Sequence, residues 1–208
     1  MSKDTTWSKN TMHSLKFIRK YMRIARAVAL DNDACYSRQL GCIIVDHLHH
    51  IKGLGYNGPS RGTPHTTEES YLREYFWETI TDDAKESLRL GYDCTMDETL
   101  DRFVEQYADC KTCPRKLLGY KSGEHNHLCS CLHAEQNAIA RAGTDLTDCA
   151  IYCWTPVPCV SCMGMVINAG IREVHCLDEI YDKRSLFLLK TADVKRSLKL
   201  VTHNADEF

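Results

Sequence analysis

The spacing of hydrophobic residues changes along the chain, and each spacing indicates a different element. In residues 14–30 the apolar positions recur at helical spacing, which predicts an amphipathic helix; they are Leu15, Ile18, Met22, Ala25 and Ala29. Two short apolar runs, 40–45 and 51–56, are joined by a polar segment and predict a β-hairpin. The segment Gly55-Tyr56-Asn57-Gly58-Pro59 then predicts a turn that ends the second strand.

The second half of the chain alternates between helical and strand patterns. Helices are expected at 134–142, 159–169 and 183–191, and strands at 149–154 and 172–177. Gly170 follows the second of these helices, where glycine is a common stop. Alternation of strand and helix predicts parallel strand pairs with helices packed on the sheet. We therefore expect an α/β fold with three layers, α/β/α, around a central mixed sheet.

Residues 66–109 continue neither pattern. They are rich in Glu, Asp and Tyr, carry helical patterns and show no strand signal. We interpret them as a helical insertion in a single domain that spans residues 1–208. A solvated surface is the simplest role for such a charged segment, and a subunit contact or a lid over the site is the alternative.

Composition narrows the class of protein. With 208 residues, 43% of them hydrophobic, the chain can bury one substantial core. Its formal net charge of −2 argues against a polynucleotide partner, whereas a mononucleotide needs only one or two cations.

No apolar run approaches the roughly 18 residues of a membrane span, and residues 1–17 are polar, without a signal-peptide core. These features predict a cytoplasmic protein without a membrane partner. In that setting, the 12 cysteines fit metal ligands and buried thiols better than disulfides.

Two short motifs carry the candidate chemistry. His133-Ala134-Glu135 supplies an imidazole and a carboxylate, and Pro158-Cys159-Val160-Ser161-Cys162 supplies two cysteines at the start of a predicted helix. The exposed N–H groups of a helix N-terminus favour thiolates. His133, Cys159 and Cys162 can hold zinc and leave its fourth tetrahedral position open for water, as in a catalytic zinc site.

Glu135 is the candidate proton shuttle. A carboxylate two residues after the histidine ligand can take a proton from zinc-activated water. It can then deliver a proton to a ring nitrogen, and later to the departing amine, of a cytosine- or adenine-like base. The ordered pair H-x-E and P-C-x-x-C is typical of zinc nucleobase deaminases. The alternative is a structural zinc with Glu135 as a surface residue.

Beyond these motifs, most of the chain resembles the deoxycytidylate (dCMP) deaminase family. The turn at 55–59, the loop 35–41, the segment 113–129 and the zinc helix at 133–139 carry the resemblance. It implies a cytidine-deaminase-like fold and zinc-dependent hydrolysis of dCMP to dUMP and ammonia. It also implies that the product feeds thymidylate synthesis.

The resemblance further implies contacts to the nucleoside. Asn57 would hydrogen-bond the sugar 3′-hydroxyl, although asparagine is also common in turns because it tolerates a left-handed conformation. Tyr181 falls where the family tends to place an aromatic residue near the site.

For the 5′-phosphate, Lys121 and Ser122 are the preferred ligands, since they offer an ammonium and a hydroxyl in a glycine-containing loop. Arg26 and Arg38 are the alternatives. Each of these four residues could equally be an ordinary solvated surface residue.

A second, structural zinc is also expected. Cys110, Cys113 and Cys129 have suitable spacing, with C-x-x-C as one half. Some family members carry an additional zinc here with one ligand at the position of Cys35, so the candidate set is Cys35, Cys110, Cys113 and Cys129. Where several members have a cysteine after the turn, this chain has Thr66. Reduced cysteines without metal are the alternative, and the rival ligands for the fourth position are His65, His125, His127 and Cys131.

The resemblance implies a homo-oligomer, commonly a hexamer, and regulation by the effectors dCTP and dTTP with Mg²⁺. Two other functions stay open. One is deamination of a different substrate, such as free cytidine, adenosine in tRNA or a riboflavin precursor. The other is a non-catalytic zinc-binding module that retains the fold for DNA uptake or scaffolding. The intact Glu135 argues against the module, because a scaffold has no need for a proton shuttle.

Overall fold

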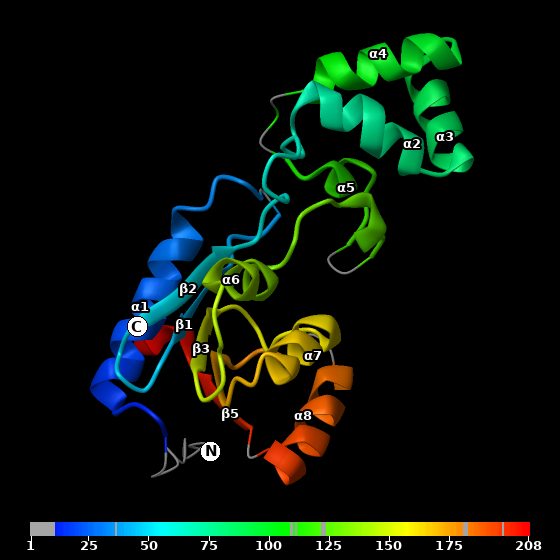
Figure 1. Ribbon diagram of the computed structural model, residues 1–208. Coiled ribbons are helices and arrows are strands. Elements are labelled where there is room, and N and C mark those ends of the chain that lie inside the picture. Colours follow the sequence, from blue (N-terminus) through cyan, green and yellow to red (C-terminus); the bar gives the residue numbers. More distant parts are fainter. Residues whose placement is uncertain are drawn as a thin grey trace. The chain divides into compact units, whose positions relative to one another are not determined.

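The computed structural model describes residues 11–35, 37–108, 110, 112–121, 124–180, 183–196 and 198–208. Its contacts divide the chain into two compact units (Figure 1). The sheet unit comprises Met1–Asp31, Leu40–Tyr56 and His133–Phe208, and the helical unit comprises Asn32–Gln39 and Asn57–Leu132. Each unit is described by itself.

The sheet unit contains a mixed sheet in the order β2-β1-β3-β4-β5 among the described residues. The strands are β1 (Gly41–Val45), β2 (Ile51–Tyr56), β3 (Ala150–Trp154), β4 (Glu173–Leu177) and β5 (Lys199–His203). β1 pairs antiparallel with both β2 and β3, whereas β3, β4 and β5 run parallel to one another. The expected α/β fold with a mixed sheet, including the hairpin, is therefore confirmed.

Helices cover both faces of this sheet (Figure 1). On one face lies α1 (Leu15–Leu30), which packs on Ile43 and Tyr152. On the other lie α6 (Ala134–Ala142), α7 (Val160–Asn168) and α8 (Lys183–Arg196), which pack around Ile44 and Ile151. Neighbouring residues of one strand thus belong to opposite cores, as the period of two along a strand requires. The three layers expected from the sequence are present.

One strand was not predicted. The periodicity ended the last helix at residue 191 and indicated nothing after it, but α8 continues to Arg196, and β5 and a short 3₁₀ turn, Ala205–Glu207, follow. β5 lies at the edge of the sheet, and four of its five residues are only half-buried. A strand in that position tolerates polar residues such as Lys199 and Thr202, so its sequence lacks a clear apolar run.

The helical unit has a core of its own. The first helical element of this unit is a π-helical segment, Tyr71–Phe76. It is followed by α2 (Trp77–Thr79), α3 (Asp82–Tyr92), α4 (Met96–Tyr107), α5 (Pro114–Leu117) and a 3₁₀ turn, Asn126–Leu128. Phe76 and Phe103 are fully buried and stack with ring centroids 5.7 Å apart. The segment 66–109 is helical as predicted, apart from Asp109, which lies outside the described residues, and it is more than a solvated surface because it supplies this core. Among the described residues, no helix combines the length and apolar character needed to cross a membrane.

Candidate metal centre and active site

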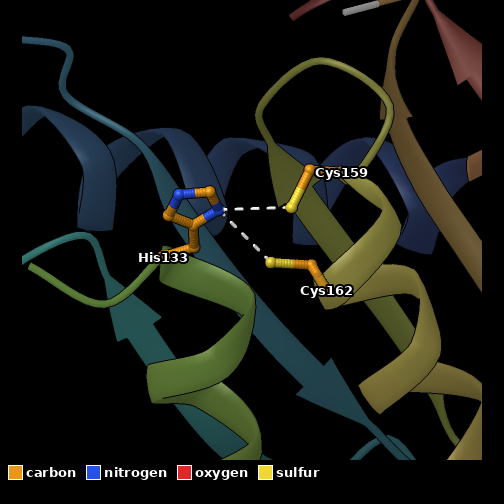
Figure 2. A group of neighbouring side chains, drawn as sticks. All are labelled: His133, Cys159 and Cys162. Atoms are coloured by element: carbon orange, nitrogen blue, oxygen red, sulfur yellow. Dashed lines mark hydrogen bonds between the residues drawn. The ribbon is translucent and has the colours of Figure 1, made fainter. Parts of the chain in front are cut away.

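The structure brings His133, Cys159 and Cys162 together in the sheet unit. His133 immediately precedes α6, Cys159 immediately precedes α7, and Cys162 lies in the first turn of α7. Figure 2 shows the imidazole reaching from the start of α6 towards both sulfur atoms. Nδ1 of His133 lies 3.3 Å from Sγ of Cys162 and 3.5 Å from Sγ of Cys159. Among the described residues, these three form the one group of three or more possible metal ligands whose ligand atoms all lie within 4.8 Å of one another.

The spacing of these atoms fits a tetrahedral zinc ion. Zn–S bonds of about 2.3 Å and Zn–N bonds of about 2.0–2.1 Å at a tetrahedral angle place the nitrogen about 3.5 Å from each sulfur. The observed distances of 3.3 and 3.5 Å agree with that value. One imidazole and two thiols also form a typical zinc donor set, with one coordination position left over.

The protonation of the two thiols favours metal binding. The pKa of Cys159 is lowered to about 4, mainly because it accepts a hydrogen bond from the Cys162 thiol and also because of the neighbouring His133. The pKa of Cys162 is raised because this thiol donates to Cys159 and is buried. Zinc binds cysteine as thiolate, so a thiol whose pKa is lowered gives up its proton to the metal more readily.

Glu135 stands beside this trio in the first turn of α6, with only 4% of its surface exposed. Burial raises the pKa of its carboxyl, while its own backbone N–H and the charge of His133 oppose the increase. A buried carboxyl next to a metal site can hold a proton that bulk water does not remove directly. This position fits the role of a proton shuttle.

Two more thiols lie close to Glu135, which the motifs did not indicate. Cys42 of β1 and Cys153 of β3 are directly opposite each other in the antiparallel pair, and both are completely buried. Burial raises the pKa of both thiols, and the Glu135 carboxyl adds to the increase. Strand alternation, which places them on the same face as Ile44 and Ile151, was the signal that could have revealed them.

A second group of cysteines forms in the helical unit. The neighbouring Cys131 side chain lowers the pKa of Cys35 to about 5 and that of Cys129 to about 7. These two neighbours and burial raise the pKa of Cys131. Cys110 instead donates its thiol to Oγ1 of Thr112 at 3.4 Å, and Cys113 is buried at the start of α5. The structure thus joins two members of the expected set, Cys35 and Cys129, through the rival ligand Cys131.

Asn57 also belongs to the helical unit and is buried, with 6% of its surface exposed. Its Oδ1 accepts a hydrogen bond from Nδ2 of Asn32 at 2.8 Å, and its Nδ2 donates to the backbone carbonyl of Arg38 at 2.8 Å. These bonds hold the side chain in one rotamer at the turn that follows β2.

The expected phosphate ligands are placed as follows. The Arg26 guanidinium, in the sheet unit, lies 5.3 Å from the centre of the Trp154 ring on the α1 face of the sheet. Lys121, in the helical unit, is exposed, and its backbone N–H donates to the Glu124 carboxylate at 2.8 Å. Arg38, also in the helical unit, receives the Asn57 hydrogen bond at its carbonyl. Ser122, the remaining phosphate candidate, lies outside the described residues, as does Tyr181, the aromatic residue expected near the base.

A known protein family matches the chain. Its model, described as the cytidine and deoxycytidylate deaminase zinc-binding region, matches residues 15–178, and this range contains His133, Glu135, Cys159 and Cys162. The chain belongs to this family. Membership supports zinc as the metal of the trio, since these residues are the described group able to hold an ion.

Individual relatives agree with this assignment. The deoxycytidylate deaminase of Saccharomyces cerevisiae is 36% identical over 179 residues, which cover 84% of this chain and 42% of the yeast protein. That of Schizosaccharomyces pombe is 25% identical over 178 residues, covering 84% of this chain and 41% of the relative. The chain thus spans about two fifths of the length of these two curated relatives. The structure of cyanophage S-TIM5 dCMP deaminase in complex with dCMP and dUMP has a TM-score of 0.55 at 18% identity, covering 92% of this chain and 99% of that chain. This likeness confirms the cytidine-deaminase fold.

Proposed function

We propose that the chain hydrolyses dCMP to dUMP with release of ammonia and so supplies dUMP for thymidylate synthesis. The observation that carries the proposal is the trio of His133, Cys159 and Cys162 next to the buried Glu135. Zinc held by the trio would lower the pKa of a water molecule so that it can attack C4 of the cytosine near neutral pH. The deoxycytidylate deaminases among the relatives support dCMP as the substrate.

In this reaction Glu135 moves the protons. Its carboxylate accepts a proton from the attacking water and delivers one to the ring nitrogen next to C4. It then transfers the second proton to the departing amine, so that water and dCMP give dUMP and ammonia. The small exposure of Glu135, 4%, supports this role because it keeps competing solvent away from the carboxyl.

The remaining contacts to the substrate are part of the proposal. Asn57 binds the sugar 3′-hydroxyl, and its fixed rotamer supports this role because little side-chain entropy is lost on binding. Lys121 and Ser122 bind the 5′-phosphate, with Arg26 and Arg38 as alternatives, and Tyr181 lies against the base.

We also propose a second zinc ion in the helical unit. Its candidate ligands are Cys35, Cys110, Cys113 and Cys129, with His65, His125, His127 and Cys131 as rivals for the fourth position. Of these, Cys35, Cys129 and Cys131 influence one another's pKa values. Two thiols with lowered pKa support this set. The three sulfurs do not all lie within 4.8 Å of one another, so metal binding requires them to move closer together.

The proposal extends to organisation and control. Residues 1–208 form one catalytic domain with the 66–109 insertion, in a cytoplasmic homo-oligomer of the hexameric type that responds to dCTP and dTTP with Mg²⁺. Sedimentation of the zinc-loaded protein tests the assembly, and an active monomer would contradict it.

Ammonia release from dCMP, CMP, dCTP, deoxycytidine and a tRNA tests the function, each with and without the two effectors. We expect selective turnover of dCMP. Turnover of another substrate instead of dCMP would show that the chain is a deaminase with a different substrate specificity. No turnover by zinc-loaded protein would favour the non-catalytic module.

A further inference from the structure

Asn137 is a buried polar residue that the proposed chemistry does not use. It lies one turn after His133 in α6, where its N–H donates to the His133 carbonyl at 3.0 Å. Only 6% of its surface is exposed. Its side-chain Nδ2 donates to the carbonyl of Tyr56, the last residue of β2, at 2.8 Å. The side chain therefore connects the helix that carries Glu135 to the end of a neighbouring strand.

The helix and the strand meet here without side chains between them. A Cβ atom at Gly55 would lie 2.3 Å from the backbone nitrogen of Ala138 and 2.4 Å from the carbonyl oxygen of Ala134. At Gly53, a Cβ atom would lie 2.5 Å from the carbonyl oxygen of Ala138. The first turns of α6 thus rest directly on the β2 backbone.

At this contact no side-chain ridges of β2 help to fix the helix along the strand. Helices are normally held in register by side-chain ridges that fit into grooves, and a glycine surface has no ridges. A directional hydrogen bond from a buried side chain can fix the position of the helix where side-chain packing does not. The Asn137 bond to Tyr56 is such a bond, and its loss would leave a buried carbonyl without this partner.

We propose that Asn137 is a positioning residue for the deamination proposed above, on which this inference rests. It fixes the rotation and the height of α6 on β2, and through α6 it fixes where the imidazole of His133 and the carboxylate of Glu135 point. Reactions of this kind are sensitive to such placement, because a displacement of about 1 Å can lower a rate by about 100-fold.

The test compares Asn137→Ala and Asn137→Asp with the unmodified protein, all loaded with zinc. Aspartate has nearly the same size as asparagine but turns an acceptor oxygen towards the Tyr56 carbonyl, so it removes the bond without opening a cavity. We expect kcat for dCMP to fall about 10- to 100-fold in both variants, with KM changed less than about threefold and zinc content unchanged.

Met22→Ala is the matched control, because Met22 is fully buried in α1 on the opposite face of the sheet. It lowers Tm without lowering kcat.

An unchanged kcat in both variants overturns the inference while leaving the function intact. Loss of activity in proportion to loss of zinc or of Tm, as in a purely structural role, overturns it as well. An unmodified protein that holds zinc but deaminates nothing overturns the proposed function, and the inference with it, and this outcome is recognised without any variant.

Discussion

Nδ1 of His133 and Sγ of Cys162 lie 3.3 Å apart, although 29 residues separate them in the chain. One atom comes from the start of α6 and the other from the first turn of α7, and both helices pack on the same face of the sheet. The metal site is thus built on two helix starts that the common core holds in place, so its geometry does not depend on a flexible loop.

Cys162→Ala removes one of only three protein ligands from the trio. We expect zinc to be lost from this site and deamination to fall by at least about 100-fold, since even supporting residues of metal sites contribute on that scale. Metal analysis and ammonia release measure both effects. Cys94→Ala is the control, because Cys94 lies between α3 and α4 and contacts Thr99. Full zinc content and activity in Cys162→Ala would exclude Cys162 as a ligand.

Glu135→Gln keeps the shape of the side chain but cannot carry the proton. We expect zinc content to stay unchanged, while kcat for dCMP falls by about 10²- to 10⁴-fold, the usual contribution of general acid–base catalysis. Steady-state kinetics on protein of known zinc content provides the measurement. A zinc-loaded variant with the activity of the unmodified protein would refute the proton-shuttle role.

Cys131→Ala tests the ligands of the second zinc. Because Cys131 neighbours both Cys35 and Cys129, we expect its removal to lower the metal content by roughly one zinc ion per chain. The first site is in the other unit and should keep its zinc. Cys110→Ala and Cys113→Ala show which cysteine is the fourth ligand. An active unmodified protein with one zinc per chain would rule out the second site.

Glu173, His175 and His203 form a buried chain of hydrogen bonds on the α1 side of the sheet. Nε2 of His175 lies 3.1 Å from Oε2 of Glu173, and Nδ1 of His175 lies 3.1 Å from Nε2 of His203. The carboxylate accepts from His175, so Nδ1 of the neutral His175 ring accepts from His203. Burial, together with the nearby His175, lowers the pKa of His203 to about 4.

This lowered pKa makes folding stability depend on pH. An unfolded chain protonates the histidine near pH 6.5, whereas the folded chain does not until about pH 4. Stability is therefore lost as pH falls through this window, by up to about 1.4 kcal/mol per pH unit for this one group. His203→Gln can still donate to His175 but cannot be protonated. We expect urea unfolding between pH 7.5 and 5 to show a shallower loss in the variant, and identical slopes would contradict the assignment.

Gly55→Ala tests the close approach of α6 to β2. The added Cβ atom meets backbone atoms of α6 at 2.3 and 2.4 Å, which no rotamer change can relieve. We expect a loss of about 3 kcal/mol or more in the free energy of unfolding, at the upper end for overpacking. Gly91→Ala in α3 is the control, because its Cβ meets nothing within 4 Å, and we expect it to be neutral or stabilising by about 0.5–1 kcal/mol. Equal stability of the two variants would show that α6 can move away from β2.

Local patterns were sufficient for much of the molecule. Helical periodicity located α1, α6 and α7, and short apolar runs located β1, β2, β3 and β4, because each buries a continuous face or run. Edge strand β5 was missed because a half-covered strand needs no apolar run. The core of the helical unit was also missed, because its buried aromatic residues lie among many charged ones.

The two motifs alone indicated which residues meet at the main site. H-x-E and P-C-x-x-C place each ligand at a helix start, and they can be recognised whatever the number of residues between them. It did not determine the cysteine group of the helical unit. Spacing favoured Cys110, Cys113 and Cys129, and the resemblance added Cys35, whereas the place of Cys131 next to Cys35 and Cys129 emerged only from the structure. Side chains in loops meet according to the path of the backbone, which depends on contacts between distant segments. The bond between Asn137 and Tyr56 likewise forms only once α6 packs on β2, and no local pattern predicts it.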